Sequence, residues 1–126
     1  MPETNLSLGK KGEDIALGFL KKNGYSIIQR NYRTKLGEID IIAKDKDTLC
    51  FIEVKSRSSC GHGLPQESVF KLKQGQISKA ALAYLKEKNL LDKRARFDVV
   101  SVLYADGETR IEIIKNAFEL DERYTI

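Results

Sequence analysis

Two short segments of the sequence carry acids and a lysine at a spacing that suits metal chemistry. Asp40 closes the run Gly-Glu-Ile-Asp, and Glu53, Val54 and Lys55 stand in the next apolar segment. The polar stretch between them, residues 44–48, is typical of a hairpin turn, and counting outward from its centre places Asp40 opposite Glu53. Opposed like charges, with Cβ atoms about 5 Å apart, destabilise a sheet. A divalent cation offsets this repulsion, because Mg²⁺ binds hard oxygen ligands, commonly one or two carboxylates.

Alternation along the two predicted strands sets which side chains share a face with these acids. In the first strand we expect Ile39, Ile41 and Ala43 on one face, and Glu38, Asp40 and Ile42 on the other. In the second strand one face carries Leu49, Phe51, Glu53 and Lys55. Because the acids alternate with apolar side chains, this face is expected to be partly buried, and buried acids need partners. The alternative interpretation is a solvent-exposed face in which Asp40, Glu53 and Lys55 form salt bridges.

A further acid lies in the first predicted helix, residues 8–23. Its apolar residues follow helical spacing: Ile15, Ala16, Phe19 and Leu20. Glu13 falls at the edge of this apolar stripe, where an ordinary surface glutamate is not favoured. We therefore treat Glu13 as a candidate site residue. The alternative is a surface glutamate that pairs with a neighbouring lysine.

The remaining pattern predicts an α/β fold in a single domain, residues 1–126. Strands are expected at 25–33, 38–44, 48–55, 96–104 and 110–115, with a second helix at 71–89. The order is αβββαββ, and the passage from strand through helix to strand implies a parallel crossover beside antiparallel hairpins, hence a mixed sheet. Residues 56–66 are expected to form a loop, which would either close over a substrate or simply connect two elements.

Composition narrows the function classes. The 126 residues are 41% hydrophobic and 32% charged, with a net charge of +4 and a pI of about 9.0, which modestly favours a polyanionic partner. The sequence has no apolar run long enough for a membrane span, and its start lacks the features of a secretion signal, so a cytoplasmic protein is expected. The single histidine, His62, gives no visible catalytic triad, and with Cys60 it falls short of a zinc site.

The acids and lysine resemble the signature of the PD-(D/E)xK, or restriction-endonuclease-like, nuclease superfamily. That signature is an acid, a spacer and then Glu-x-Lys, matched here by Asp40 and Glu53-Val54-Lys55. The chain is similar in more detail to the YraN-like family of small bacterial proteins, itself similar to archaeal Holliday-junction resolvases. The likeness is carried by residues 9–16, 37–40, 51–57, 73–74 and 96–100. One departure is Gln76, where relatives often have a basic residue, which puts a DNA contact at that position in doubt.

The resemblance implies a restriction-endonuclease-like fold, in which a central mixed sheet of about five strands is flanked by helices. It also implies a Mg²⁺- or Mn²⁺-dependent endonuclease acting on DNA, including branched DNA, and a homodimer if the protein acts as junction resolvases do. Glu13 matches a first-helix glutamate that reaches the active site in those resolvases.

The constellation itself gives a mechanistic hypothesis. Asp40 and Glu53 hold the metal and the Val54 carbonyl completes the coordination. Glu13 ligates the metal, directly or through water, or binds a second metal. Lys55, kept charged by the acids, orients the attacking water. Candidate DNA contacts near the motifs are Arg33, Lys35, Arg57, Lys73 and Gln74, each of which could also be simple surface polarity. A non-catalytic nucleic-acid-binding module and a protein-interaction subunit remain alternatives.

Overall fold

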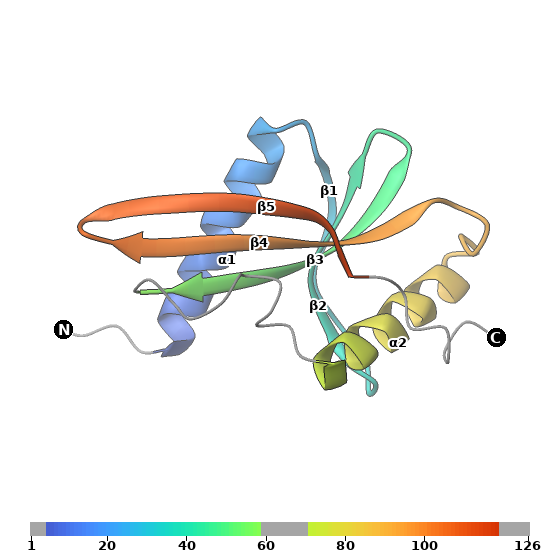
Figure 1. Cartoon of the computed structure of the whole chain (residues 1–126). Coiled ribbons are helices and arrows are strands. Elements are labelled where there is room, and N and C mark those ends of the chain that lie inside the picture. The colour runs from blue at the N-terminus through green and yellow to red at the C-terminus, as the bar shows by residue number, and fades with distance from the viewer. Residues whose placement is uncertain (1–4, 59–70, 119–126) are drawn as a thin grey trace.

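The protein folds into one five-stranded sheet with two helices (Figure 1). The computed structural model describes residues 5–58 and 71–118, and the side chains of residues 9–58 and 73–117 within them. Cys60, His62 and most of the predicted loop lie outside these ranges. The elements in chain order are α1 (Asn5–Lys22), β1 (Ser26–Arg33), β2 (Glu38–Asp45), β3 (Thr48–Arg57), α2 (Lys71–Glu87), β4 (Ala95–Ala105) and β5 (Glu108–Phe118). The predicted α/β class and the order αβββαββ are therefore confirmed.

The sheet is mixed, as the sequence predicted. Its strands lie in the order β1-β2-β3-β4-β5. Only β3 and β4 are parallel, because α2 connects them, and the other three pairs are antiparallel. β3 is the central strand and is paired on both sides. Glu53 therefore stands on a strand whose backbone is held by both of its neighbours.

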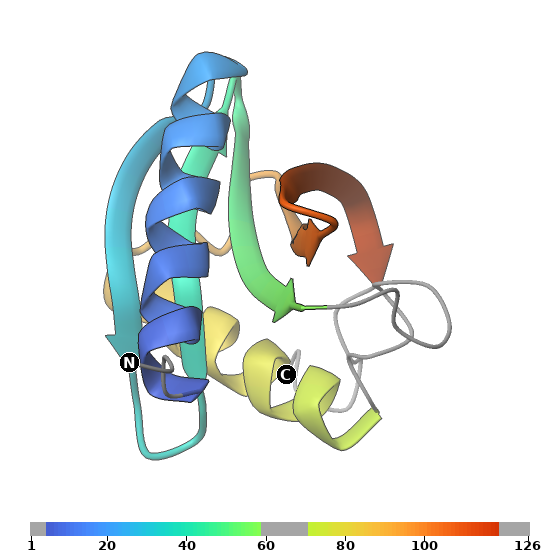
Figure 2. The same cartoon turned by 90° about the vertical axis from the view of Figure 1, so that its left-hand side faces the viewer.

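Each face of the sheet packs against one helix (Figure 2). The α2 face buries Ile42, Phe51 and Phe97 against Ala81 and Tyr84, whereas the α1 face is closed by the α1 residues Ala16 and Leu20. Because strand side chains alternate, neighbouring residues of β3 supply both cores. Neither helix, among the residues that the structure describes, has the length and apolar character that a membrane crossing requires.

The predicted hairpin register is confirmed where the ladder is formed. The pairs Asp45–Thr48, Ala43–Cys50 and Ile42–Phe51 all occur, and the β2–β3 ladder ends at Ile41–Ile52. Asp40 and Glu53 stand one step beyond that last pair. The two acids are therefore neighbours at the point where main-chain pairing between these strands stops.

One part of the predicted alternation is wrong. Ile39 packs in the α2-side core with Ile42, whereas Ile41 packs in the α1-side core, so β2 does not alternate regularly through Asp40. The irregularity has a counterpart in β1, where Asn31 adopts a φ of 51°. Asn31 stands between the Arg30–Ile41 and Tyr32–Ile39 pairs, hence across from Asp40. Because both strands are distorted at this point, the side chains of β2 do not alternate between the two faces of the sheet as they do in a regular strand.

The extents of β3 and β5 also differ from the prediction. β3 continues through Ser56 and Arg57, which were expected to open the loop, because parallel pairing with β4 extends to Arg57–Leu103. β5 begins earlier and ends later than expected, since its pairing with β4 runs from Glu108 to Phe118. The predicted turn between these strands is confirmed, with positive φ at both Asp106 and Gly107, as a type I′ hairpin requires.

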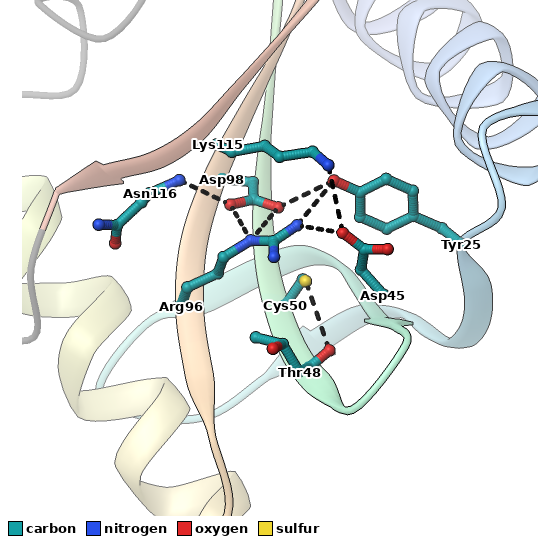
Figure 3. Close-up of polar contacts among 8 residues, drawn as sticks. All are labelled: Tyr25, Asp45, Thr48, Cys50, Arg96, Asp98, Lys115 and Asn116. Atoms are coloured by element: carbon teal, nitrogen blue, oxygen red, sulfur yellow. Dashed lines mark hydrogen bonds and ion pairs between the residues drawn. The ribbon is translucent and has the colours of Figure 1, made fainter.

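A buried polar network fixes the end of the sheet near the β2–β3 turn (Figure 3). Asp98 is fully buried in β4, and its carboxylate accepts hydrogen bonds from Arg96 Nε at 2.9 and 3.1 Å and from the Asn116 backbone N–H at 2.9 Å. The Tyr25 hydroxyl donates a further bond at 3.2 Å. Arg96 in turn reaches Asp45 at 2.7 Å. This network stabilises a buried charge by pairing it and by satisfying its oxygen atoms.

The network generates a stability prediction. Asp98→Asn is expected to lower the free energy of unfolding by about 3 kcal/mol, because it leaves Arg96 without its buried carboxylate partner. Urea unfolding followed by circular dichroism measures the change. The matched control is Asp92→Asn, an exposed aspartate whose loss should change stability by less than about 0.5 kcal/mol. Equal stabilities of the two variants would show that the Arg96–Asp98 pair does not hold this end of the sheet.

Candidate metal site

The candidate site lies at the end of the sheet opposite the buried network. The end of β3, the starts of α1 and α2, and the β1–β2 turn lie together in the lower half of Figure 2. Asp40 comes from β2, Glu53 from β3, Glu13 from α1 and Lys73 from α2, so four elements contribute to one region. The fold thus gathers the predicted acids at one end of the molecule.

Asp40 carries the strongest electrostatic signature of the site. Its Oδ2 accepts a hydrogen bond from the Val54 backbone N–H at 2.8 Å, in place of a further ladder bond. Burial, and then repulsion from Glu53, raise the pKa of Asp40 from 3.8 to about 8, against the Val54 bond, which lowers it. Glu13 adds a smaller repulsion and Lys73 a compensating attraction. The effect of Glu53 on the pKa of Asp40 agrees with the predicted closeness of the two acids.

Glu53 is buried, with 6% of its side chain exposed, and it forms an ion pair with Lys73. Burial lowers the pKa of Lys73, but its hydrogen bond to Glu53 and the charges of Glu53 and Asp40 outweigh burial, and the net pKa is raised. The exposed face of salt bridges among Asp40, Glu53 and Lys55, considered as an alternative, does not describe this arrangement. The acid is enclosed, and the ammonium in contact with it comes from α2.

Glu13 is half-buried and faces β1. Its Oε1 lies 3.8 Å from Arg30, so its partner is an arginine of β1 and not the neighbouring lysine considered above. Burial is the main cause that raises the pKa of Glu13, opposed by Arg30 and by a hydrogen bond with Asn31. Glu13 thus approaches Asp40 from the α1 side, although its effect on Asp40 is smaller than that of Glu53.

The other predicted members of the site lie on the same strand. Val54 and Lys55 follow Glu53 in β3, and both are half-buried. Alternation places Lys55 on the face that carries Glu53, about 6 to 7 Å further along the strand. The Val54 amide is engaged by Asp40, so the Asp40 carboxylate and the Val54 backbone are in direct contact.

The predicted DNA-contacting residues spread around this end. Arg33 is exposed and pairs with Glu38 at 3.3 Å, and Lys35 is exposed in the β1–β2 turn. Arg57 is half-buried, and its Nε finds no hydrogen-bond acceptor among the residues that the structure describes. Gln74 is half-buried in α2, next to Lys73. Lys73 forms an ion pair with Glu53, an acid of the predicted pair.

Asp40 and Glu53 form the closest electrostatic pair among the candidate acids. Within residues 5–58 and 71–118, no group of three or more histidine, cysteine, aspartate or glutamate side chains is arranged to hold a metal ion. Repulsion from Glu53 raises the pKa of Asp40 more than repulsion from Glu13 does. A pair is compatible with Mg²⁺, which usually keeps several water molecules and takes one or two carboxylates.

Two contributions to the site were missed in the sequence. Asn31 forms a hydrogen bond with Glu13 and lies across from Asp40. The available signal in the sequence was the asparagine itself, because asparagine is enriched at positive φ, which Asn31 adopts. The pairing of Lys73 with Glu53 was also missed, since the two residues are distant in sequence and only the crossover of α2 brings them together. Sequence spacing alone contains no information on that contact.

Close backbone approaches hold the elements of the site together. A Cβ atom at Gly12 would lie 1.7 Å from Ser56 Oγ, so α1 packs directly on the end of β3 one residue before Glu13. A Cβ atom at Gly37 would lie 2.5 Å from the backbone oxygen of Gln76, so the β1–β2 turn packs equally closely on α2. Both glycines occupy positions that a larger residue would force apart.

These features define a three-layer α/β protein with a carboxylate pair, half-buried Asp40 and buried Glu53, at one end of its sheet. The chain belongs to Uncharacterised protein family UPF0102, whose model matches residues 12–102; this is the YraN-like family that the sequence resembles. It is 51% identical to a UPF0102 protein of Geobacter sulfurreducens over 117 residues, covering 92% of this chain and 91% of that protein. A UPF0102 protein of Geotalea uraniireducens is 55% identical, with 92% of each chain covered. The names of these relatives assign no activity.

The packing of α1 can be tested with two glycines of the same helix. Gly12→Ala is expected to destabilise the protein by about 1–3 kcal/mol, because the added methyl group overpacks against Ser56. Gly18→Ala is the control, since a Cβ there meets nothing within 4 Å, and it should stabilise the helix by about 0.5–1 kcal/mol. Thermal unfolding measures both changes. Stabilisation by both substitutions would contradict the close contact of α1 with β3.

The raised pKa of Asp40 predicts a pH dependence of stability. Since the pKa is about 8 in the folded protein and 3.8 ordinarily, protonated Asp40 contributes its full stabilisation below about pH 4, and this is lost as the pH rises to about 8. Asp40→Asn cannot ionise, so in EDTA it should have the higher Tm at pH 8, and the advantage should shrink toward pH 4. Asp92→Asn is the control. A difference in Tm that does not vary with pH would contradict the raised pKa.

Proposed function

We propose that this protein is a metal-dependent endonuclease that hydrolyses phosphodiester bonds in DNA. The observation that carries the proposal is the enclosed pair of mutually repelling carboxylates, Asp40 and Glu53, beside lysines at one end of the sheet. A purely structural sheet gains nothing from such a pair, because two acids in this position destabilise it. The pair becomes favourable when a cation with two positive charges lies between the carboxylates.

The donor set is suited to Mg²⁺ or Mn²⁺. Both acids present oxygen ligands, and backbone carbonyls such as that of Val54 are ligands of the same hard type. Glu13, whose charge has a smaller effect on Asp40 than that of Glu53, would contact the metal directly or through water. When bound, the metal would supply Lewis-acid stabilisation of a phosphate oxygen and lower the pKa of a coordinated water molecule.

The protein side chains have separate tasks in this proposal. Asp40 and Glu53 position the cation, and the Val54 N–H keeps the Asp40 carboxylate oriented. Lys55, on the same face of β3 as Glu53, orients the attacking water and stabilises charge that develops on the phosphate. These roles require that the two carboxylates are ionised in the metal-bound protein, which the cation itself favours.

The surroundings of the acids support a nucleic-acid substrate. Arg33 and Lys35 on the β1–β2 turn, Arg57 at the end of β3 and Lys73 on α2 give the acidic pair a basic border. Arg57 Nε, buried without an acceptor in the described structure, is suited to a phosphate oxygen. Such contacts position a substrate without reading its sequence. The likeness to junction resolvases extends the proposal to branched DNA and to a homodimer, and the proposal includes a cytoplasmic location.

A second candidate function is a nucleic-acid-binding module that does not cleave. The ion pair of Lys73 with Glu53 favours it, because the buried acid is then neutralised without a metal. The endonuclease should cleave DNA when a divalent metal is present, whereas the binding module should bind DNA without cleaving it. One assay separates the two candidates.

The assay incubates the purified protein with linear, nicked and four-way DNA in Mg²⁺, Mn²⁺ or EDTA. We expect cleavage in the metal buffers and at least a hundredfold loss of rate in Asp40→Asn and Glu53→Gln, because a bound metal provides several kcal/mol of transition-state stabilisation. Asp92→Asn, an exposed acid away from the site, should cleave at the wild-type rate. DNA binding without cleavage in any buffer, unchanged by Asp40→Asn, would instead establish the binding module.

A further inference from the structure

We propose that Lys73 is the resident counter-ion of the candidate metal site and that the metal ion displaces it. This inference rests on the proposed metal site and adds a mechanism for its loading. In the structure the Lys73 ammonium contacts Glu53 Oε1, an atom of a carboxylate that would coordinate the metal. The cation and the Lys73 ammonium would then compete for Glu53.

Glu53 needs a positive partner in the metal-free state. Its side chain is 6% exposed, and an ionised carboxylate so enclosed is strongly destabilising without a compensating charge. The neighbouring Asp40 adds a repulsion and not a compensation. Lys73 is the residue that the structure places in contact with Glu53, and it therefore keeps the carboxylate pair from destabilising the sheet.

Lys73 is also placed so that it can leave. About 45% of its side chain is exposed, whereas Glu53 is enclosed, so the lysine can rotate into solvent while the acid stays fixed in β3. A lysine ammonium is strongly hydrated and sits on a flexible stem, so a solvated position is readily available to it. The ion pair is thus asymmetric, with a fixed anion and a mobile cation.

Charge and ligand number decide the direction of the exchange. Lys73 brings one positive charge and contacts Glu53, while Asp40 takes its hydrogen bond from the Val54 N–H. A divalent cation brings two positive charges and can coordinate both carboxylates, which removes their mutual repulsion. The metal would therefore compensate the charge of both carboxylates, whereas the Lys73 ammonium contacts Glu53 and leaves Asp40 with a neutral amide donor.

The released ammonium gains a second role in this scheme. It lies at the metal site, where a substrate phosphate would bind, so it becomes available to DNA only after the metal has taken its place on Glu53. Metal binding and DNA binding would then be coupled, and each would raise the affinity of the other by the same factor. In this scheme Lys73 joins the other basic residues around the site as a phosphate contact only when the metal is bound.

The decisive experiment measures metal affinity in the absence of DNA. Mn²⁺ is titrated calorimetrically into wild type, Lys73→Met and the control Lys86→Met, which removes the same charge from the last turn of α2. We expect Lys73→Met to bind Mn²⁺ about tenfold more tightly than wild type, because the ammonium that competes with the metal for Glu53 has been removed. The effect is limited to about tenfold because the Lys73 side chain is partly exposed and solvent screens its charge. Lys86→Met should bind as wild type does, and Lys73→Arg, which keeps the charge, should also stay near wild type.

Thermal unfolding of the same proteins gives a second readout. In EDTA, Lys73→Met should have a lower Tm than wild type, since Glu53 is left without its partner, and saturating Mn²⁺ should raise the Tm of Lys73→Met more than that of wild type. If Lys73→Met does not fold in EDTA, Lys73→Gln replaces it in both measurements. A further control, Glu53→Gln with Lys73→Met, removes both charges and should lose the Mn²⁺ effect.

The outcomes separate the two proposals. Tighter Mn²⁺ binding by Lys73→Met alone supports the exchange. Equal affinities of wild type and Lys73→Met, with Mn²⁺ bound by both, would overturn the exchange and leave the proposed nuclease intact. Absence of Mn²⁺ binding in every variant would overturn the metal site itself and the exchange with it.

Discussion

The repulsion between two carboxylates at one end of the sheet is the interaction on which the rest of the site depends. It arises because β2 and β3 bring Asp40 and Glu53 together where their ladder ends, in surroundings that exclude much of the solvent. Neither strand can move away, since β3 is held on both sides and both strands are covered by a helix. The Val54 amide and the Lys73 ammonium compensate this charge, whereas Glu13 adds to it.

Among the residues whose side chains the structure describes, two acids are buried, and they are stabilised in different ways. Asp98 accepts hydrogen bonds from Arg96 in β4, from Asn116 in β5 and from Tyr25 just before β1, and its guanidinium partner is itself held by Asp45. Glu53 has a half-exposed lysine from a helix. The first arrangement stabilises the fold, whereas the second is the contact that the proposed metal ion would replace. The contrast agrees with a structural role for one end of the sheet and a binding role for the other.

The sequence was sufficient for whatever depends on short spacing. Alternation and turn composition predicted the register at Ala43–Cys50 and Ile42–Phe51, and helical spacing predicted that α1 and α2 carry the apolar stripes. What it could not predict depends on contacts across elements or on local distortion. The face of Ile39 was wrong because β2 is irregular at Asp40, and the partner of Glu53 was missed because it comes from a distant helix.

The hydrogen bond from the Val54 amide to Asp40 makes this acid part of the backbone pairing as well as part of the site. An alanine at position 40 would remove a negative charge and would also leave a peptide N–H of the central strand without an acceptor. Any loss of activity would then mix missing chemistry with a loosened sheet. An asparagine keeps a carbonyl oxygen for that amide, so it isolates the contribution of charge. A comparison of the two substitutions would measure how much the hydrogen bond from Val54 to the side chain at position 40 stabilises the sheet.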